Sequence, residues 1–198
     1  MLYYNSVKNQ DSVYLEKLRD YYAEHRVFPS FSGIAKLVGL RTTSAVSVLV
    51  GRLKESGFLD STPDRRLQPG TRFFERPVAD TVAAGLPQPA NEVGVEGLNV
   101  DAFLIDNPSR TVLLTVKGDS MVEAGLLPGD TVIVKRGAPH QVGSIVVAKV
   151  DQEFTVKFLA RDKRGFYLKP GNPAYPPIRP RDDLDIYGVV TGSFRRYA

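Results

Sequence analysis

The stretch TVLLTVKGDSMVEAGLLPGDTVIV, residues 111–134, decides the fold of the C-terminal part of the chain. It predicts two strands, at 112–116 and 131–134, because apolar and β-branched residues fill both segments and turn residues lie between them. Further strands are predicted at 145–150, 154–159, 166–168 and 186–191, and residues 150–153 are typical of a tight hairpin. Short strands with frequent turns indicate a compact, largely antiparallel β domain.

The connection between the first two predicted strands carries a candidate nucleophile. Gly118, Asp119, Ser120 and Met121 follow the first strand. A glycine-containing turn can present a serine hydroxyl at the surface, and its backbone N–H groups can stabilise an oxyanion. Taken alone, the motif is weak evidence, because most serines that follow a glycine are ordinary turn residues.

A serine nucleophile needs a base, and Lys157 is the candidate. The two histidines, His25 in a helical segment and His140 in a polar turn, are poorly placed for this role. A lysine can act instead when its amine is neutral, and desolvation lowers the pKa of a lysine. Alternation along the strand puts Lys157 on the same face as Thr155 and Leu159. The strand by itself also fits a lysine on a solvent-facing side.

Residues 68–92 are predicted to form a linker that continues into an extended segment. They hold several prolines and glycines and show no sustained periodicity. Small residues around Ala84 and Gly85 would let this backbone approach a nucleophile closely. A plain flexible linker is the alternative interpretation.

The N-terminal part predicts three helices and a small β wing. Apolar residues recur at helical spacing over 12–24, and a short second helix follows the break at 29–32. A third helix ends at Gly57, and segments 58–60 and 65–67 form the wing. The caps and buried positions that carry this prediction are Gly39, Thr42 or Thr43, Val46, Leu49 and Leu53. Two short helices joined by a tight glycine turn indicate a helix-turn-helix.

The positive charge of the chain lies in its first part. The net charge is +4, and residues 1–76 hold 12 Lys and Arg against 8 Asp and Glu, whereas the remainder is balanced. This distribution is typical of a nucleic-acid-binding module joined to another domain. Cysteine is absent and histidine is scarce, so we expect no disulfide, no metal site and no cofactor. The apolar runs are too short to span a bilayer, so no membrane association is expected.

Three motifs in this order resemble the LexA repressor family, whose C-terminal domain is shared with UmuD and with phage repressors. Ala83-Ala84-Gly85 is similar to the family's self-cleavage site, and Gly118-Asp119-Ser120-Met121 is similar to its nucleophile motif. Glu153-Phe154-Thr155-Val156-Lys157 is similar to the strand that carries its catalytic lysine. The resemblance extends over nearly the whole chain.

The resemblance implies an α+β fold with three parts. A winged helix-turn-helix DNA-binding domain would occupy residues 1–68, and a linker with the self-cleavage segment would occupy 69–92. Residues 93–198 would form a mostly antiparallel β domain of the LexA/UmuD type, which dimerises and acts as an S24-type serine/lysine peptidase.

The resemblance also implies a mechanism and partners. Ser120 would attack the bond between Ala84 and Gly85 of its own chain, with Lys157 as base. The oxyanion would be held by backbone N–H groups of Asp119, Ser120 and Met121. In the family, a RecA filament on single-stranded DNA stimulates this cleavage. The chain would then be a homodimeric repressor of DNA-damage (SOS) genes, bound to a palindromic double-stranded operator at the nucleoid of a bacterial cytoplasm.

The expected DNA-contacting residues lie at the third helix and are Arg41, Thr42, Thr43, Ser44, Ala45, Ser47, Val48 and Arg52. Arg41, Arg52, Lys54, Arg65 and Arg66 are candidates for phosphate contacts, with solvated surface charges as the alternative. Other family members often carry Asn and Glu on this helix, and this chain does not. We therefore expect an operator that differs from the best-known one.

Three other functions share parts of this pattern. A phage-type or ligand-responsive repressor would use the β domain for dimerisation only. A UmuD-like polymerase accessory factor is disfavoured by the N-terminal helices. A signal-peptidase-like enzyme would use the same Ser/Lys chemistry, and the absence of an apolar membrane segment argues against it.

Overall fold

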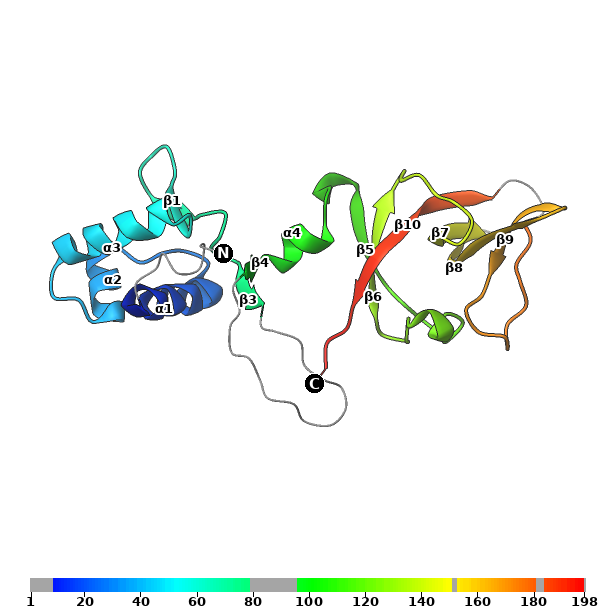
Figure 1. The fold of residues 1–198 in the computed structure, drawn as a ribbon, viewed down its shortest axis with the longest axis horizontal. Coiled ribbons are helices and arrows are strands. Elements are labelled where there is room, and N and C mark those ends of the chain that lie inside the picture. Colours follow the sequence, from blue (N-terminus) through cyan, green and yellow to red (C-terminus); the bar gives the residue numbers. More distant parts are fainter. Residues whose placement is uncertain (1–8, 79–95, 151–152, 181–183, 198) are drawn as a thin grey trace. The chain divides into compact units, whose positions relative to one another are not determined.

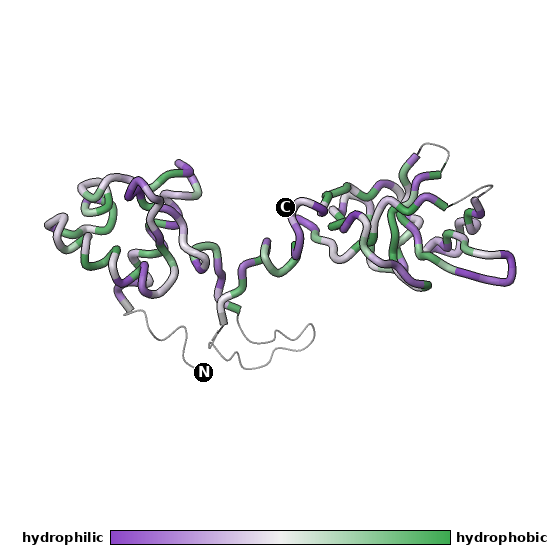
Figure 2. Tube along the Cα trace, turned by 90° about the horizontal axis from the view of Figure 1, so that it is seen from above, coloured by the Kyte–Doolittle hydropathy of each residue, from purple (hydrophilic) through white to green (hydrophobic). Residues whose placement is uncertain are grey.

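The computed structural model describes residues 9–78, 96–150, 153–180 and 184–197, and the chain divides into two compact units, Met1–Val100 and Asp101–Ala198 (Figure 1). Helices dominate the first unit and strands the second. In Figure 2, hydrophobic and hydrophilic residues alternate in short runs through both units. Among the described residues, no single helix is long and apolar enough to cross a membrane, although the bent pair Phe31–Val38 and Thr43–Glu55 passes by length and composition.

Three helices build the core of the first unit: α1 (Asn9–His25), α2 (Phe31–Val38) and α3 (Thr43–Glu55). Local capping explains their ends. The Ser30 hydroxyl accepts from the Gly33 N–H at the start of α2, and Gly39 closes that helix in the left-handed conformation. Thr42 caps α3 by accepting from the Ala45 N–H. The apolar faces of the helices meet in one core that includes Leu18, Ile34, Val46, Leu49 and Leu53.

A hairpin follows the helices, formed by β1 (Leu59–Ser61) and β2 (Leu67–Pro69). The expected return strand at 65–67 begins later than predicted, because Arg65 takes a positive φ and lies in the turn. A second antiparallel pair joins β3 (Arg76–Val78) to β4 (Glu96–Leu98). The core of this unit also extends beyond residue 68, the predicted domain end, since Phe73 is only 1% exposed within it. The order of helices and hairpin is that of a winged helix-turn-helix, and this assignment stays a prediction.

The second unit is one six-stranded antiparallel sheet in the order β5-β6-β10-β7-β8-β9. Its strands are β5 (Thr111–Thr115), β6 (Thr131–Arg136), β7 (Ile145–Val150), β8 (Glu153–Asp162), β9 (Gly165–Lys169) and β10 (Asp185–Phe194). Each of the six strands predicted from the sequence overlaps one of them, which confirms the α+β class with an antiparallel sheet. The short helices α4 (Val100–Leu104), η1 (Pro108–Arg110) and η2 (Val122–Ala124) complete the unit.

Long-range pairing brings separate parts of the second unit together. β10 pairs with both β6 and β7, and its register shifts at two irregularities. The sheet buries two apolar clusters, one around Met121, Val132 and Val147 and one around Val146 and Leu159. The first cluster lies beneath the connection from β5 to β6, so that connection rests on a packed core.

Candidate functional site

The serine turn directly follows β5 and is tied at its base. The Val116 N–H donates to the Asp130 carbonyl at 2.8 Å, and the Gly129 N–H donates to the Val116 carbonyl at 3.0 Å. Gly118 takes φ +74°, a conformation that side chains disfavour, and it turns the chain toward Ser120. The Met121 side chain is buried in the core below. These hydrogen bonds and the buried Met121 side chain therefore fix the position of the turn that carries Ser120.

Lys157 lies on β8 with its side chain directed inward. It is 6% exposed, and Leu159, two residues along the same face, is 2% exposed. The pairing of β8 with β7 places Lys157 opposite the buried Val146. This burial excludes the solvent-facing alternative that the strand pattern had left open.

The side chains of Ser120 and Lys157 meet although 37 residues separate them. The Lys157 amine donates to the Ser120 hydroxyl at 2.8 Å, to the Thr155 hydroxyl at 3.0 Å and to the Val156 carbonyl at 2.9 Å. Burial lowers the pKa of the Lys157 ammonium, because the charged form loses hydration. Among the described residues, no carboxylate forms an ion pair with Lys157 that would oppose this shift. A neutral amine beside a hydroxyl is the arrangement that can activate a serine.

A cavity of about 270 Å³ adjoins the two side chains. Leu114, Val147 and Phe154 contribute apolar walls to it, and Ser120 and Lys157 line it. Among the described residues, none accepts a hydrogen bond from the backbone N–H of Asp119, Ser120 or Met121. These three donors therefore remain available for an oxyanion. The predicted cleavage bond, Ala84–Gly85, lies outside the described residues.

The loop after β9 contacts the serine turn, a feature that the sequence did not predict. The Glu123 N–H donates to the Gly171 carbonyl at 2.8 Å, and the Gly171 N–H contacts the Met121 sulfur at 3.3 Å. The Asn172 side-chain amide donates to the Asp119 carbonyl at 3.1 Å. These pairs are about 50 residues apart in sequence, so no local pattern could reveal them.

A buried ion pair anchors the other end of the same connection. Asp130 is 2% exposed, and its carboxylate accepts from Arg195 at 2.5 and 2.7 Å and from the Leu127 N–H at 2.8 Å. The Arg195 guanidinium, together with the Leu127 N–H, lowers the pKa of Asp130 to about 2. The pair ties the segment after β10 to the loop that carries Ser120.

In the first unit, the outer face of α3 presents the residues predicted to contact DNA. Ser44, Ser47 and Val48 are exposed, Val48 by 59%, and Ala45 is half-buried. Arg41 and Thr43 are exposed at the start of the helix. Hydroxyl and apolar side chains make up this face of α3, and its role in DNA binding stays a prediction.

Three of the predicted phosphate contacts have intramolecular partners, and for Arg66 the partner is the Asp64 carboxylate at 2.8 Å. Arg52 donates twice to the carboxylate of Asp11, at 2.6 and 2.7 Å, and Asp11 is 4% exposed. The Lys54 amine donates to the Ser61 hydroxyl at 2.5 Å. Arg52 thus joins α1 to α3, and its contribution to this joint does not depend on DNA.

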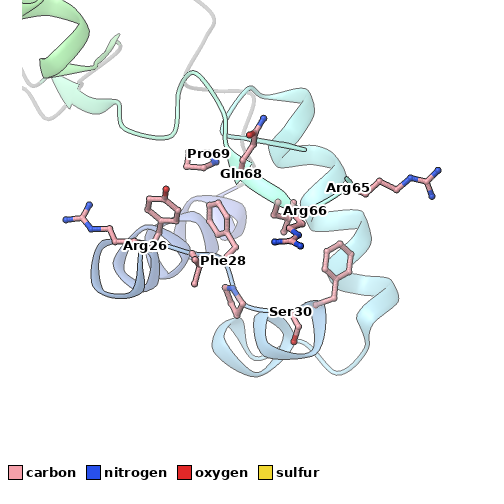
Figure 3. Close-up of a pocket in the computed structure, with 12 residues that line it drawn as sticks. Arg26, Phe28, Ser30, Arg65, Arg66, Gln68 and Pro69 are labelled. Atoms are coloured by element: carbon pink, nitrogen blue, oxygen red, sulfur yellow. The ribbon is translucent and has the colours of Figure 1, made fainter. Parts of the chain in front are cut away.

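Arg65 and Arg66 border a cavity of about 480 Å³ between the hairpin and the start of α2 (Figure 3). Phe28 and Ser30 line it from the opposite wall. Arg26 and Arg65 extend away from the cavity on opposite sides in this view. Both arginines of the hairpin turn are exposed, and Arg66 is paired there with the Asp64 carboxylate.

Within the described part of the chain, neither histidine forms a hydrogen bond or ring contact with the serine turn. His25 packs against Tyr21 with ring centroids 4.2 Å apart and the rings tilted by 56°, and His140 is exposed. No group of three His, Asp or Glu side chains that could hold a metal occurs in the described part of the chain.

Comparison with known proteins matches residues 77–191 to the Peptidase S24-like family. The chain is 37% identical over 195 residues to LexA repressor 2 of Pseudomonas putida, covering 91% of this chain and 94% of the relative. It is 35% identical over 188 residues to the LexA repressor of Alcanivorax borkumensis, with 91% and 92% covered. The LexA repressor of Acetivibrio thermocellus is 30% identical over 211 residues, with 97% and 99% covered.

Proposed function

Because the chain belongs to the LexA repressor family, we propose that it represses DNA-damage response genes and inactivates itself by cutting between Ala84 and Gly85. The contact of 2.8 Å between the Lys157 amine and the Ser120 hydroxyl supports this proposal most directly. The Lys157 amine is buried, has a serine hydroxyl as partner and forms no ion pair with a carboxylate of the described residues, which fits the chemistry of a serine–lysine dyad.

In the first step, neutral Lys157 takes the proton of the Ser120 hydroxyl. The Ser120 oxygen then forms a bond to the Ala84 carbonyl carbon. Negative charge develops on the Ala84 oxygen, and the free N–H groups of Asp119, Ser120 and Met121 are the donors that stabilise it.

In the second step, the bond between Ala84 and Gly85 breaks. The Lys157 ammonium gives its proton to the leaving Gly85 nitrogen, which leaves Ala84 as an ester of Ser120. Water, deprotonated by Lys157, then attacks this ester, and Ser120 departs with the proton. Two fragments result, and the dyad returns to its initial state.

Cleavage would end repression because it breaks the covalent connection between the DNA-binding unit and the dimerising unit. Two α3 helices of a dimer would read the halves of a palindromic operator, while the second units hold the dimer together. A cut at Ala84 separates the DNA-binding unit from the dimerising unit. The two DNA-binding units are then no longer linked, so binding of one half-site no longer favours binding of the other, and the affinity for the operator falls. A RecA filament that binds the form with the segment docked at Ser120 would shift the population toward cleavage.

Self-cleavage is tested by incubating the purified chain at alkaline pH, and separately with RecA, single-stranded DNA and a nucleotide. We expect two fragments with a new N-terminus at Gly85, and a rate that rises with pH as Lys157 loses its proton. Ser120→Ala is expected to stay intact under both conditions. A cut that persists in that variant would contradict the assignment of the nucleophile.

Operator binding is tested by a gel shift with the promoter of the chain's own gene at moderate salt. The uncleavable Ser120→Ala protein is expected to retard this DNA and the cleaved wild-type protein is expected to release it. Failure of the intact protein to bind at any salt concentration would rule out the repressor function.

A further inference from the structure

We propose that Asn172 is a positioning residue for self-cleavage, because it orients the Ser120 N–H as an oxyanion donor through the Asp119–Ser120 peptide plane. This inference rests on the proposed self-cleavage. Within the described residues, Asn172 forms no hydrogen bond with Ser120 or Lys157. Its effect is carried by the backbone of the serine turn.

The geometry of a peptide group supplies the physical reason. The Asp119–Ser120 peptide bond is planar and trans, so the Asp119 carbonyl and the Ser120 N–H point in opposite directions. Fixing the carbonyl therefore fixes the direction of the N–H. The Asp119 carbonyl accepts from the Asn172 amide at 3.1 Å and from the Val122 N–H at 3.2 Å.

The same two hydrogen bonds strengthen the donor. Hydrogen bonds accepted by a carbonyl polarise its peptide group, which makes the N–H at the other end a stronger donor. Among the described residues, that N–H has no acceptor of its own. It is oriented and polarised, and it is available for the charge that develops on Ala84.

The loop itself is built to hold Asn172 in place. The Asn172 side-chain oxygen accepts from the Ala174 N–H at 3.0 Å, which leaves its amide directed at Asp119. The neighbouring Gly171 is buried, and a Cβ added there would lie 3.2 Å from Phe158 and 3.4 Å from the Met121 Cα. The Tyr175 hydroxyl also donates to the Asp119 carboxylate. The turn is thus held from one side by a loop that packs closely against it.

The test compares the first-order cleavage rates of the full chain and two variants between about pH 6 and pH 10. Asn172→Ala removes the donor, and we expect a plateau rate about tenfold lower with an unchanged midpoint, since Lys157 is not touched. Asn172→Asp keeps the size and the bond to Ala174 but turns an anion toward the Asp119 carbonyl and toward the Asp119 carboxylate, which lies 3.5 Å from the amide nitrogen. We expect it to be about a hundredfold slower than wild type. Asn107→Asp, whose side chain contacts Ser109 and not the turn, is the matched control.

The order of the two variants separates positioning from simple loop packing. If only the shape of the loop mattered, the isosteric Asn172→Asp would cleave faster than Asn172→Ala. That order, or an Asn172→Ala rate equal to wild type, would overturn the inference while leaving the proposed function intact. Absence of cleavage in the wild type would instead overturn both. Melting curves accompany the rates, and if Asn172→Ala is unfolded, the rate of Asn172→Asp decides the question.

Discussion

Lys157 and Asp130 are both buried in the second unit, yet their charges meet opposite surroundings. Asp130 is held by the guanidinium of Arg195, and its pKa falls to about 2. The Lys157 amine donates to neutral acceptors alone among the described residues, and burial lowers its pKa. An opposite charge stabilises the ionised form of a buried carboxylate, so the pair contributes to structure. A buried ammonium group without a counter-ion loses its proton more easily and can act as a base. The same domain thus separates a structural ionisable group from a reactive one.

The largest effect is expected when Lys157 can no longer become neutral. In Lys157→Arg, a positive charge stays at this position because a guanidinium remains protonated up to pH values above about 12. We expect cleavage to slow by at least about a hundredfold at every pH tested. Fragment formation on gels measures the rate, and Lys149→Arg on the neighbouring strand is the control. A cleavage rate of Lys157→Arg equal to that of the wild type would show that Lys157 is not the base.

A carboxylate placed beside Lys157 would make it resemble the Asp130 pair. The Thr155 hydroxyl lies 3.0 Å from the Lys157 amine, so Thr155→Asp brings an anion into contact. An opposite charge favours the protonated amine, and we expect the midpoint of the pH–rate profile to rise by about 1–3 units. Thr155→Asn has the same size without the charge and should keep the wild-type midpoint. Equal midpoints in the two variants would contradict the pKa argument.

Removing the charge of Asp130 should lower stability and alter its dependence on pH. The folded pKa of Asp130 lies below the ordinary value of about 4 for an aspartate. The stabilisation is therefore fully present above about pH 4 and is lost as the pH falls through about 2. Asp130→Asn should have a lower melting temperature at pH 6, and the difference from wild type should shrink toward pH 2.

The matched control for this prediction is Asp162→Asn. Asp162 pairs with Arg179 at the surface, where ion pairs contribute little to stability. We expect its melting temperature to stay close to that of the wild type. An equal loss in both variants would indicate that burial does not distinguish the two pairs.

The smallest effect is expected from the corresponding buried pair in the first unit. Asp11→Asn weakens the link from α1 to α3, because one charge-assisted pair to Arg52 is lost. We expect the free energy of opening of the α1 and α3 amides, measured by hydrogen exchange, to fall by about 2 kcal/mol. Operator binding should weaken as well. Asp20→Asn, at an exposed position of α1, should leave both unchanged. If Asp11→Asn weakens DNA binding without a change in exchange, Arg52 acts on DNA directly.

Local signals predicted much of the fold correctly. Thr42 and Gly39 end their helices as caps do, and this depends on residues at most a few positions away. The strand segments were predictable for the same reason, since alternation and turn residues are short-range patterns. The sequence also predicted Ser120 and Lys157 as candidate catalytic residues. Neither residue indicates this role by itself, and the prediction depends on the order of the three motifs along the chain.

By itself, then, the sequence determined the caps, the strands and the chemical identity of the candidate dyad, all of which are encoded over a few neighbouring residues. Only the tertiary structure decided that Lys157 is buried, with no counter-ion in the described part of the chain, and that its amine reaches Ser120. It also decided that Asn172 holds the Asp119 carbonyl, and that Arg52 belongs to Asp11. These contacts join residues 37 to 53 positions apart. Which residues meet across such a separation in sequence depends on the order of the strands and on packing, and both are properties of the whole fold.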